Sequence, residues 1–264
     1  MRLFIDTCVL PRCRLESAAV YRERYGTELG FELLPMFDLA EWEENLERNL
    51  SIFAQGPLIF HEPVWGVEHT ALPGTPGWTE SMYHLRLTRK YADILHPSAM
   101  VVHLNNCPVP DGAQAWMLRS ALKRLEELRD MFHDVPLWLE NTGTAVDGTM
   151  LLDQAEFTGL CLERKSDVLI DIGHANANGW DLPRLVEELK GLIRGFHLHN
   201  NDGIHDQHRR VNDGTIDFPR LLRLIRQKTP EADLVIEYTR PELHGEPLLE
   251  DIAEVMKTLR DERT

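Results

Sequence analysis

The chain has 264 residues, and 43% of them are hydrophobic, so it can bury a sizeable core and is not expected to be disordered. Asp and Glu number 43 against 28 Lys and Arg, which gives a formal charge of −15. This balance argues against docking on duplex DNA, because such binding is driven by cationic side chains that displace counterions. It does not exclude a small anionic ligand held by a local metal cluster.

Targeting and redox features point to a cytoplasmic protein that makes no contact with a membrane. No segment approaches the roughly 18 apolar residues that a membrane helix needs. Residues 1–13 lack a basic region followed by a long apolar stretch. The four cysteines form no C-x-x-C pair, and we expect reduced, mostly buried thiols at Cys8, Cys13, Cys107 and Cys161.

Eight short apolar runs recur along the chain, and each is followed by polar loop residues and then by a helical pattern. They cover residues 2–6, 31–37, 57–62, 100–105, 136–141, 167–172, 194–200 and 233–238. Most are continuous rather than alternating, which is typical of parallel strands buried on both faces.

Helical periodicity fills the intervals between these runs. Residues 117–132 place their leucines on one stripe. Residues 181–193 and 217–227 each start with an Asp that can cap the helix and carry a Pro two residues later. Residues 247–263 supply a last helix.

Eight strands alternating with eight helices in about 260 residues match a (β/α)8 TIM barrel in number and length. We find no linker, low-complexity stretch or internal repeat, so we predict one domain over residues 1–264. The structural alternative is a doubly wound open sheet. That fold would need a glycine-rich phosphate loop after its first strand, and residues 5–13 (IDTCVLPRC) contain no glycine.

Ionisable side chains gather where the predicted strands end. Nine of them end a strand or follow one: His69, His103, Glu140, Asp171, His174, His197, Asp206, His208 and Glu237. In a barrel these ends converge on one face, where such enzymes place their chemistry. Burying about nine such groups together without a cation would cost severe repulsion and desolvation.

The residue types of this set agree with one another. Imidazoles and carboxylates suit zinc, manganese or iron, and soft thiolates are not among them. Asp171-x-x-His174 and Asp206-x-His208 each bring a carboxylate and an imidazole within a few residues, so a turn can direct both at one ion or at two neighbouring ions. The sequence therefore predicts a divalent-metal site.

Several motifs occur in the order and spacing of a known superfamily: LWLENTG (137–143), LIDIGHA (169–175), GFHLHNND (195–202), DQH (206–208), DGTIDF (213–218) and LVIEY (234–238). On these motifs the chain resembles the xylose-isomerase-like TIM barrels. This superfamily includes sugar isomerases, sugar epimerases and apurinic-site endonucleases of the endonuclease IV type. The resemblance runs from about residue 57 to residue 240 and bears on fold and metal binding more than on substrate.

The resemblance implies a ligand set for each branch. Sugar epimerases of the superfamily hold one divalent ion, and the matching residues are Glu140, Asp171, His197 and Glu237. The endonuclease branch carries three zinc ions. Its pattern adds one ion at His69, His103 and Glu140 and another at His174, Asp206 and His208, so that Glu140 bridges two ions.

Two departures from the endonuclease pattern bear on this assignment. Asn212-Asp213-Gly214 stands where Gly-Glu-Gly usually follows the D-x-H motif, which leaves the substrate contacts open. The spacing to His69 is one residue shorter than the pattern implies, which makes His61 the rival ligand. His199 is either a further ligand or a residue that supports one.

Two reactions are compatible with these residues. The full set favours hydrolysis of a phosphoester, because neighbouring ions bind phosphate, activate water and stabilise the leaving oxygen. The alternative is a sugar isomerase or epimerase with one ion and with Glu140 and Glu237 as the acid–base pair. A metal-dependent binding barrel without catalysis is a third option. We favour hydrolysis with up to three ions, zinc or else manganese, because D-x-H with His174 has a clear purpose only with more than one ion.

The expected substrate is a small molecule, phosphorylated or sugar-like. No basic stripe with interleaved aromatic residues indicates a nucleic acid. Arginines can hold a phosphate or carboxylate bidentately, and aromatic rings can stack on a base or sugar. The substrate-binding candidates are Arg209, Arg210, Arg240, Trp65, Trp180 and Asn141, with Asn105 and Asn106 as further candidates for hydroxyl binding. The oligomeric state is not predicted.

Overall fold

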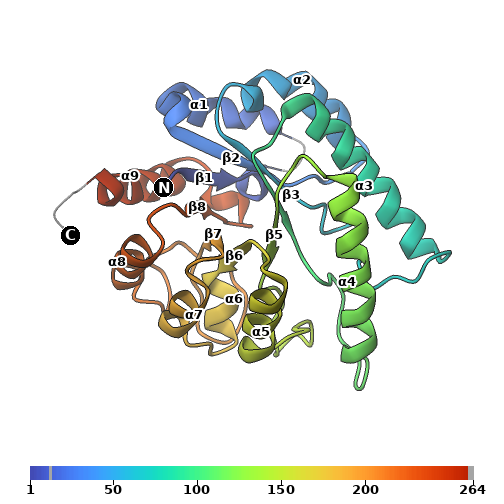
Figure 1. The fold of residues 1–264 in the computed structure, drawn as a ribbon. Coiled ribbons are helices and arrows are strands. Elements are labelled where there is room, and N and C mark those ends of the chain that lie inside the picture. The colour runs from blue at the N-terminus through green and yellow to red at the C-terminus, as the bar shows by residue number, and fades with distance from the viewer. Residues whose placement is uncertain (12–13, 261–264) are drawn as a thin grey trace.

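A computed structural model describes residues 1–11 and 14–260. Eight parallel strands close into a barrel in the order β1-β2-β3-β4-β5-β6-β7-β8, and helices surround it (Figure 1). The predicted (β/α)8 TIM barrel is confirmed, and the doubly wound alternative is wrong because the sheet has no open edge. Cys13, one of the thiols expected to be reduced, lies outside the described residues.

The strands lie where the apolar runs predicted them. Their bounds are β1 Leu3–Asp6, β2 Leu29–Leu33, β3 Leu58–His61, β4 Met100–Val102, β5 Leu137–Glu140, β6 Val168–Asp171, β7 Ile193–Leu198 and β8 Asp233–Ile236. The strand predicted at 31–37 is displaced toward the N-terminus. It cannot continue far beyond Leu33 because Pro35 has no backbone N–H to donate to a neighbouring strand.

The helices follow the predicted periodicity. Their bounds are α1 Ala19–Tyr25, α2 Trp42–Ala54, α3 Pro76–Leu95, α4 Gln114–Met131, α5 Gln154–Arg164, α6 Ile172–Ala177, α7 Leu182–Leu189, α8 Phe218–Lys228 and α9 Glu246–Arg260. The two predicted aspartate caps are present, since Asp181 accepts a hydrogen bond at the start of α7 and Asp217 at the start of α8. Among the described residues, no helix combines the length and the apolar character needed to cross a membrane.

One layer of side chains inside the barrel is apolar. Side chains alternate between the two faces of a strand, so every second residue points into the barrel. Six inward residues form a cluster with Ala99 that is separate from the core under the helices: Phe4, Ile59, Val101, Trp138, Leu169 and Val235. Glycines complete this layer in β2 and β7. A Cβ on Gly30 would lie 2.2 Å from the Phe4 ring, and one on Gly195 would lie 3.0 Å from Trp138.

The position two residues beyond each of these layer residues is ionisable in all eight cases, and for β4 and β8 it is the first residue after the strand. These residues, which we call the ionisable ring, are Asp6, Glu32, His61, His103, Glu140, Asp171, His197 and Glu237. The strand registers place them side by side, because Asp6 pairs with Glu32 and Asp171 pairs with His197. The mouth of the barrel at the carboxyl ends of the strands is therefore lined by titratable groups.

Candidate metal centre

His197 is a fully buried member of the ionisable ring that lies close to four of its carboxylates. Its Nδ1 atom is 3.3 Å from Glu237 Oε2 and 3.6 Å from both Glu140 Oε2 and Asp171 Oδ2. Its Nε2 atom donates to Glu32 Oε1 at 2.9 Å, which turns Nδ1 toward the three carboxylates. We call His197, Glu140, Asp171 and Glu237 the second donor group. One nitrogen facing three carboxylates suits a divalent cation.

Glu140 also faces two histidines on the other side. His61 Nε2 lies 3.3 Å and His103 Nε2 lies 3.1 Å from Glu140 Oε2. The opposite nitrogen of each ring donates to an oxygen of the protein, from His61 to the backbone of Glu62 at 2.8 Å and from His103 to Asn106 at 2.6 Å. These contacts direct both Nε2 atoms at Glu140. His61, His103 and Glu140 form the first donor group.

His69 does not join this group. Its Nε2 atom lies 2.5 Å from Glu62 Oε2, and both residues are buried. The other oxygen of Glu62 accepts hydrogen bonds from the His103 backbone at 3.2 Å and from Asn106 at 3.0 Å. His69 thus lies behind the first group, and His61 occupies the place that the resemblance implied for His69. The reason is the strand alternation, because His61 is two residues after the inward-facing Ile59.

The loop after β7 supplies most of a third donor group. Asp206 Oδ2 lies 3.3 Å from His174 Nε2 and 3.0 Å from His208 Nε2. His208 has a left-handed backbone with φ of 42°, and its Nδ1 atom donates to the Glu237 backbone carbonyl at 3.1 Å. His174 Nδ1 lies 3.2 Å from Glu140 Oε1. The third group of His174, Asp206 and His208 therefore adjoins the other two through Glu140.

Imidazoles of the ring and of the third donor group offset part of the charge of the neighbouring carboxylates. Burial raises the pKa of Glu140, but the neighbouring imidazoles of His103 and His197 outweigh burial and lower this pKa well below its usual range. Burial lowers the pKa of His61, but the Glu140 hydrogen bond and the Glu32 charge outweigh it and raise the pKa to about 10. Against the same effect of burial, Glu237 and Asp206 raise the pKa of His208 to about 9. Protons on the imidazoles thus offset the carboxylates, and divalent cations can replace those protons.

Several buried polar atoms of the three groups have no hydrogen-bond partner among the described residues. They are His174 Nδ1, His197 Nδ1, Asp206 Oδ1 and Glu237 Oε2. Buried polar atoms are nearly always paired, so these atoms indicate a ligand that accepts lone pairs. Within the first group the donor atoms all lie within 4.8 Å of one another, and the same is true within the third group. The residues therefore fit a divalent-metal centre.

Two ring residues were missed by the sequence analysis. Asp6 and Glu32 end β1 or lie within β2, are fully buried, and each has one oxygen without a hydrogen-bond partner among the described residues. Burial raises the pKa of Asp6 well above its usual range, and the Glu32 charge adds to this effect. Both runs were interpreted only as apolar strands. The alternation from Phe4 to Asp6 and from Gly30 to Glu32 is the signal that identifies them.

The three predicted arginines lie in different surroundings. Arg210 donates to both oxygens of Asp251, at 2.9 and 2.8 Å, and to Glu250 at 2.8 Å, so it ties the β7–α8 loop to α9. Arg240 is exposed. Arg209 directly follows His208 and is half-buried, and its side chain makes no hydrogen bond or ion pair with any residue that the structure describes.

The predicted asparagines are engaged by the protein. Asn141 donates to the Asp171 carbonyl at 3.0 Å and accepts from the Asp171 N–H at 2.8 Å, which joins the ends of β5 and β6. Asn105 donates to the backbone carbonyls of Cys107 and Thr149. Together with the contacts of Asn106, these bonds position the ring and its loops.

The two predicted tryptophans differ in exposure. Trp65 follows β3 and is 51% exposed, so its ring is open to a ligand. Trp180 is half-buried and packs on Phe157 with ring centroids 6.0 Å apart. The thiols outside residues 12–13 are free, with Cys8 and Cys161 buried and Cys107 half-buried.

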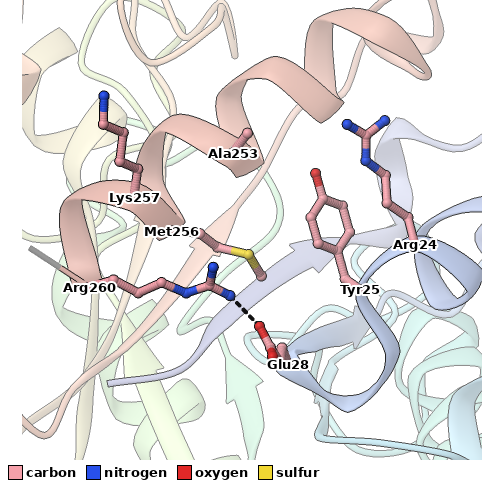
Figure 2. Close-up of a pocket in the computed structure, with 7 residues that line it drawn as sticks. All are labelled: Arg24, Tyr25, Glu28, Ala253, Met256, Lys257 and Arg260. Atoms are coloured by element: carbon pink, nitrogen blue, oxygen red, sulfur yellow. Dashed lines mark hydrogen bonds and ion pairs between the residues drawn. The ribbon is translucent and has the colours of Figure 1, made fainter.

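A cavity of about 590 Å³ lies away from the ring, between α1 and α9 (Figure 2). Its lining includes Arg24, Tyr25, Lys257 and Arg260, and Arg260 pairs with Glu28. Glu28 immediately precedes β2, so this cavity lies near the amino end of that strand. It contains no residue of the three donor groups.

Comparison with known proteins agrees with this architecture. The xylose isomerase-like TIM barrel family matches residues 58–261. The chain belongs to this family. It is also 32% identical over 73 residues to the uncharacterized protein MJ1311 of Methanocaldococcus jannaschii. That match covers 26% of this chain and spans about a quarter (25%) of the length of MJ1311.

Solved structures of the same fold cover nearly the whole chain. The IOLI protein with a bound zinc atom is 18% identical with a TM-score of 0.74, over 98% of this chain and 96% of that one. A D-tagatose 3-epimerase-like protein is 18% identical with a TM-score of 0.73, over 98% and 100%. Endonuclease IV from Thermus thermophilus is 19% identical with a TM-score of 0.64, over 98% of both chains. This xylose isomerase-like barrel therefore shares its fold with proteins of two different named activities.

Proposed function

We propose that this barrel is a divalent-metal-dependent hydrolase that cleaves a small phosphoester or phosphodiester. The observation that carries the proposal is the third donor group of His174, Asp206 and His208 beside the other two. Epimerisation with one ion uses only the second group. A set of two imidazoles and a half-buried carboxylate next to it has a clear purpose if further ions bind.

The proposed ligands form three adjacent sets, with His61 in place of His69. They are His61, His103 and Glu140; Glu140, Asp171, His197 and Glu237; and His174, Asp206 and His208. Glu140 Oε2 lies near His61 and His197, and its Oε1 lies near His174, which supports a shared role for this carboxylate. Zinc suits these donors, and manganese accepts the same types. When bound, neighbouring divalent ions hold a phosphate, activate water and stabilise the leaving oxygen.

The chain's own residues would bind and orient the substrate. Arg209 is the cation next to the third group whose guanidinium has no ion-pair partner among the described residues, and we assign it to a phosphate oxygen. Exposed Trp65 can stack on a base or a sugar ring of the substrate. The charge of −15 disfavours duplex DNA and favours a small substrate.

The second candidate is a sugar isomerase or epimerase. The observation in its favour is that Glu140 and Glu237 both face His197 Nδ1, at 3.6 and 3.3 Å, as two carboxylates around one ion site. They would move a proton as base and acid. The likeness to a D-tagatose 3-epimerase-like protein supports this candidate, and the likeness to endonuclease IV supports hydrolysis.

Metal content and one pair of variants separate the two functions. We expect close to three ions per chain by elemental analysis and cleavage of bis-p-nitrophenyl phosphate. His208→Ala should remove the third ion and reduce cleavage by at least about a hundredfold. His205→Ala is the matched control, because His205 lies in the same loop but is exposed, and among the described residues its side chain pairs with Asp202 alone. One ion per chain, no cleavage and epimerisation of a ketohexose that survives His208→Ala would establish the alternative.

A further inference from the structure

His199 lies directly after β7 and contacts members of two donor groups. It is fully buried. Its Nε2 atom lies 2.9 Å from Asp171 Oδ2, in the second group. Its ring stacks on the ring of His208, in the third group, with centroids 3.9 Å apart and planes at 14°. The resemblance assigns His199 no role, yet its side chain contacts both groups.

Space for this ring is created by Gly173. A Cβ at position 173 would lie 1.9 Å from His199 Cε1 and 2.3 Å from Nδ1, which is closer than any real contact. The backbone of Gly173 does not have a positive φ, so a side chain is excluded by space and not by backbone conformation. The Gly173 carbonyl accepts a hydrogen bond from Asn201 at 2.8 Å, which holds the two segments together. The end of β6 and the end of β7 are therefore fitted to each other around His199.

The geometry argues against His199 as a ligand. Its Nε2–H is directed at Asp171 Oδ2, which leaves Nδ1 as the nitrogen that could bind an ion. Nδ1 has no hydrogen-bond partner among the described residues, and His199, His208 and Glu237 each have a donor atom within 4.8 Å of the others. The His199 and His208 rings are nearly parallel, however, so their in-plane lone pairs converge poorly on one ion between them. Asp171 Oδ2 is at the same time 3.6 Å from His197 Nδ1. A bond from His199 thus holds the carboxylate oxygen that faces the second group.

We propose that His199 is a positioning residue that supports metal binding in both groups, through two separable contacts. Its hydrogen bond orients the Asp171 carboxylate for the second group, and its ring holds the His208 imidazole for the third. Partners of this kind that lie behind metal ligands change metal affinity by about 10–100-fold. The inference rests on metal binding in the proposed function and not on the reaction that follows.

Two substitutions separate the contacts. His199→Phe keeps a ring against His208 and removes the hydrogen bond to Asp171. His199→Gln keeps an amide donor and removes the ring. Zinc affinity of the full-length protein is measured by titration against a chromophoric chelator. We expect His199→Phe to weaken the second-group ion and His199→Gln to weaken the third-group ion, each by about 10–100-fold.

The same variants in a His208→Ala background assign each effect. There the third group is already lost, so His199→Gln should cause no further loss, whereas His199→Phe should still weaken zinc. Unchanged zinc affinity in both single variants would overturn the inference, and so would a loss from His199→Gln that is equally large with and without His208. Circular dichroism and thermal unfolding in chelator check that each variant is folded.

Gly173→Ala tests the inference without touching any histidine. It should displace the His199 ring and weaken zinc, and it should add nothing to His199→Ala, where the ring is absent. Additive losses would overturn the role of His199. A protein that binds three zinc ions but cleaves no phosphoester would contradict the proposed function and leave these affinity predictions standing.

Discussion

The two inward layers of the barrel are built by the same eight strands and have opposite chemistry. One consists of apolar side chains and two glycines, and the other, two residues along each strand, is the ionisable ring. Both are buried, so burial alone does not explain the difference. The apolar layer stabilises the fold by removing surface from water. The ring brings charges out of water at a cost, which indicates that it serves binding.

The two layers also differ in their titratable groups. In the ring, burial and neighbouring carboxylates raise the pKa of Asp6 well above its usual range, while the carboxylates raise the pKa of His61 against the effect of burial. The apolar layer has no titratable group. Substitutions in the ring should therefore change metal binding and its pH dependence. Substitutions in the apolar layer should change the free energy of unfolding.

The sharpest separation comes from Glu140→Gln. This change replaces the carboxylate shared by the donor groups with a weaker, neutral ligand. We expect loss of at least two ions per chain and loss of either candidate activity by more than about a hundredfold. Elemental analysis and turnover assays measure this. Full metal content in the variant would show that Glu140 is not the shared ligand.

The counterpart in the adjacent layer is Trp138→Ala, two residues earlier in β5. Removing a large buried ring should lower the free energy of unfolding by about 3–5 kcal/mol. Zinc bound per folded chain should stay unchanged. Urea denaturation in chelator gives the stability, and elemental analysis gives the metal. If the variant had normal stability but lost zinc, the two layers would not have the separate roles that we assign to them.

Metal binding and metal-free stability should respond to pH with opposite signs. The pKa of His61 is about 10 and that of His208 about 9, both above 6.5. Zinc must displace these protons, so apparent affinity should rise by roughly tenfold per pH unit for each displaced proton between about pH 6 and 8. The same raised pKa values stabilise the metal-free fold below pH 6.5, and this contribution is lost as pH rises through about 9–10. Affinity that is flat with pH would contradict the proposed protonation.

One glycine inside the apolar layer and one glycine outside it together test how tightly the layer is packed. Gly30→Ala places a Cβ against the Phe4 ring and should destabilise by about 1–3 kcal/mol. A Cβ at Gly159, an exposed position of α5, meets nothing within 4 Å, so Gly159→Ala should stabilise by about 0.5–1 kcal/mol. Thermal unfolding of both variants gives the comparison. If both substitutions changed the stability equally, the barrel interior would have space for an added methyl group at position 30.

The smallest expected effect on metal affinity comes from contacts outside the ring, where α9 holds the β7–α8 loop. Asp251 accepts from Arg210 and from Tyr238, and the Tyr238 hydroxyl accepts from the Val211 N–H. Asp251→Asn should loosen the β7–α8 loop and weaken the third ion by several-fold, up to about tenfold. Chelator titration measures it, with Glu254→Gln in α9 as control because Glu254 contacts only Asn212 in that loop. Loss of the first or second ion would show that the effect is not confined to the loop.

Much of the candidate site was visible in the sequence because polar residues at the ends of buried strands stand out against apolar runs. His103, Glu140, Asp171, His197 and Glu237 all lie in the ionisable ring. Arg210 was misleading, because proximity to a ligand in the chain does not reveal that α9 offers Asp251 as a partner. Asp6 and Glu32 were passed over because their runs were interpreted only as strands.

The sequence by itself determined the barrel, its eight strands and most of the imidazoles and carboxylates at its mouth, because period and apolar pattern are local properties. The choice of His61 over His69, the pairing of Glu32 with His197 and the stacking of His199 on His208 were decided only by tertiary structure. The contacts of His61 with Glu140 and of Glu32 with His197 join strands far apart in the chain, and the stacking of His199 on His208 depends on how the β7–α8 loop folds back over the end of β7. Closure of the barrel sets those distances, and no local pattern contains them.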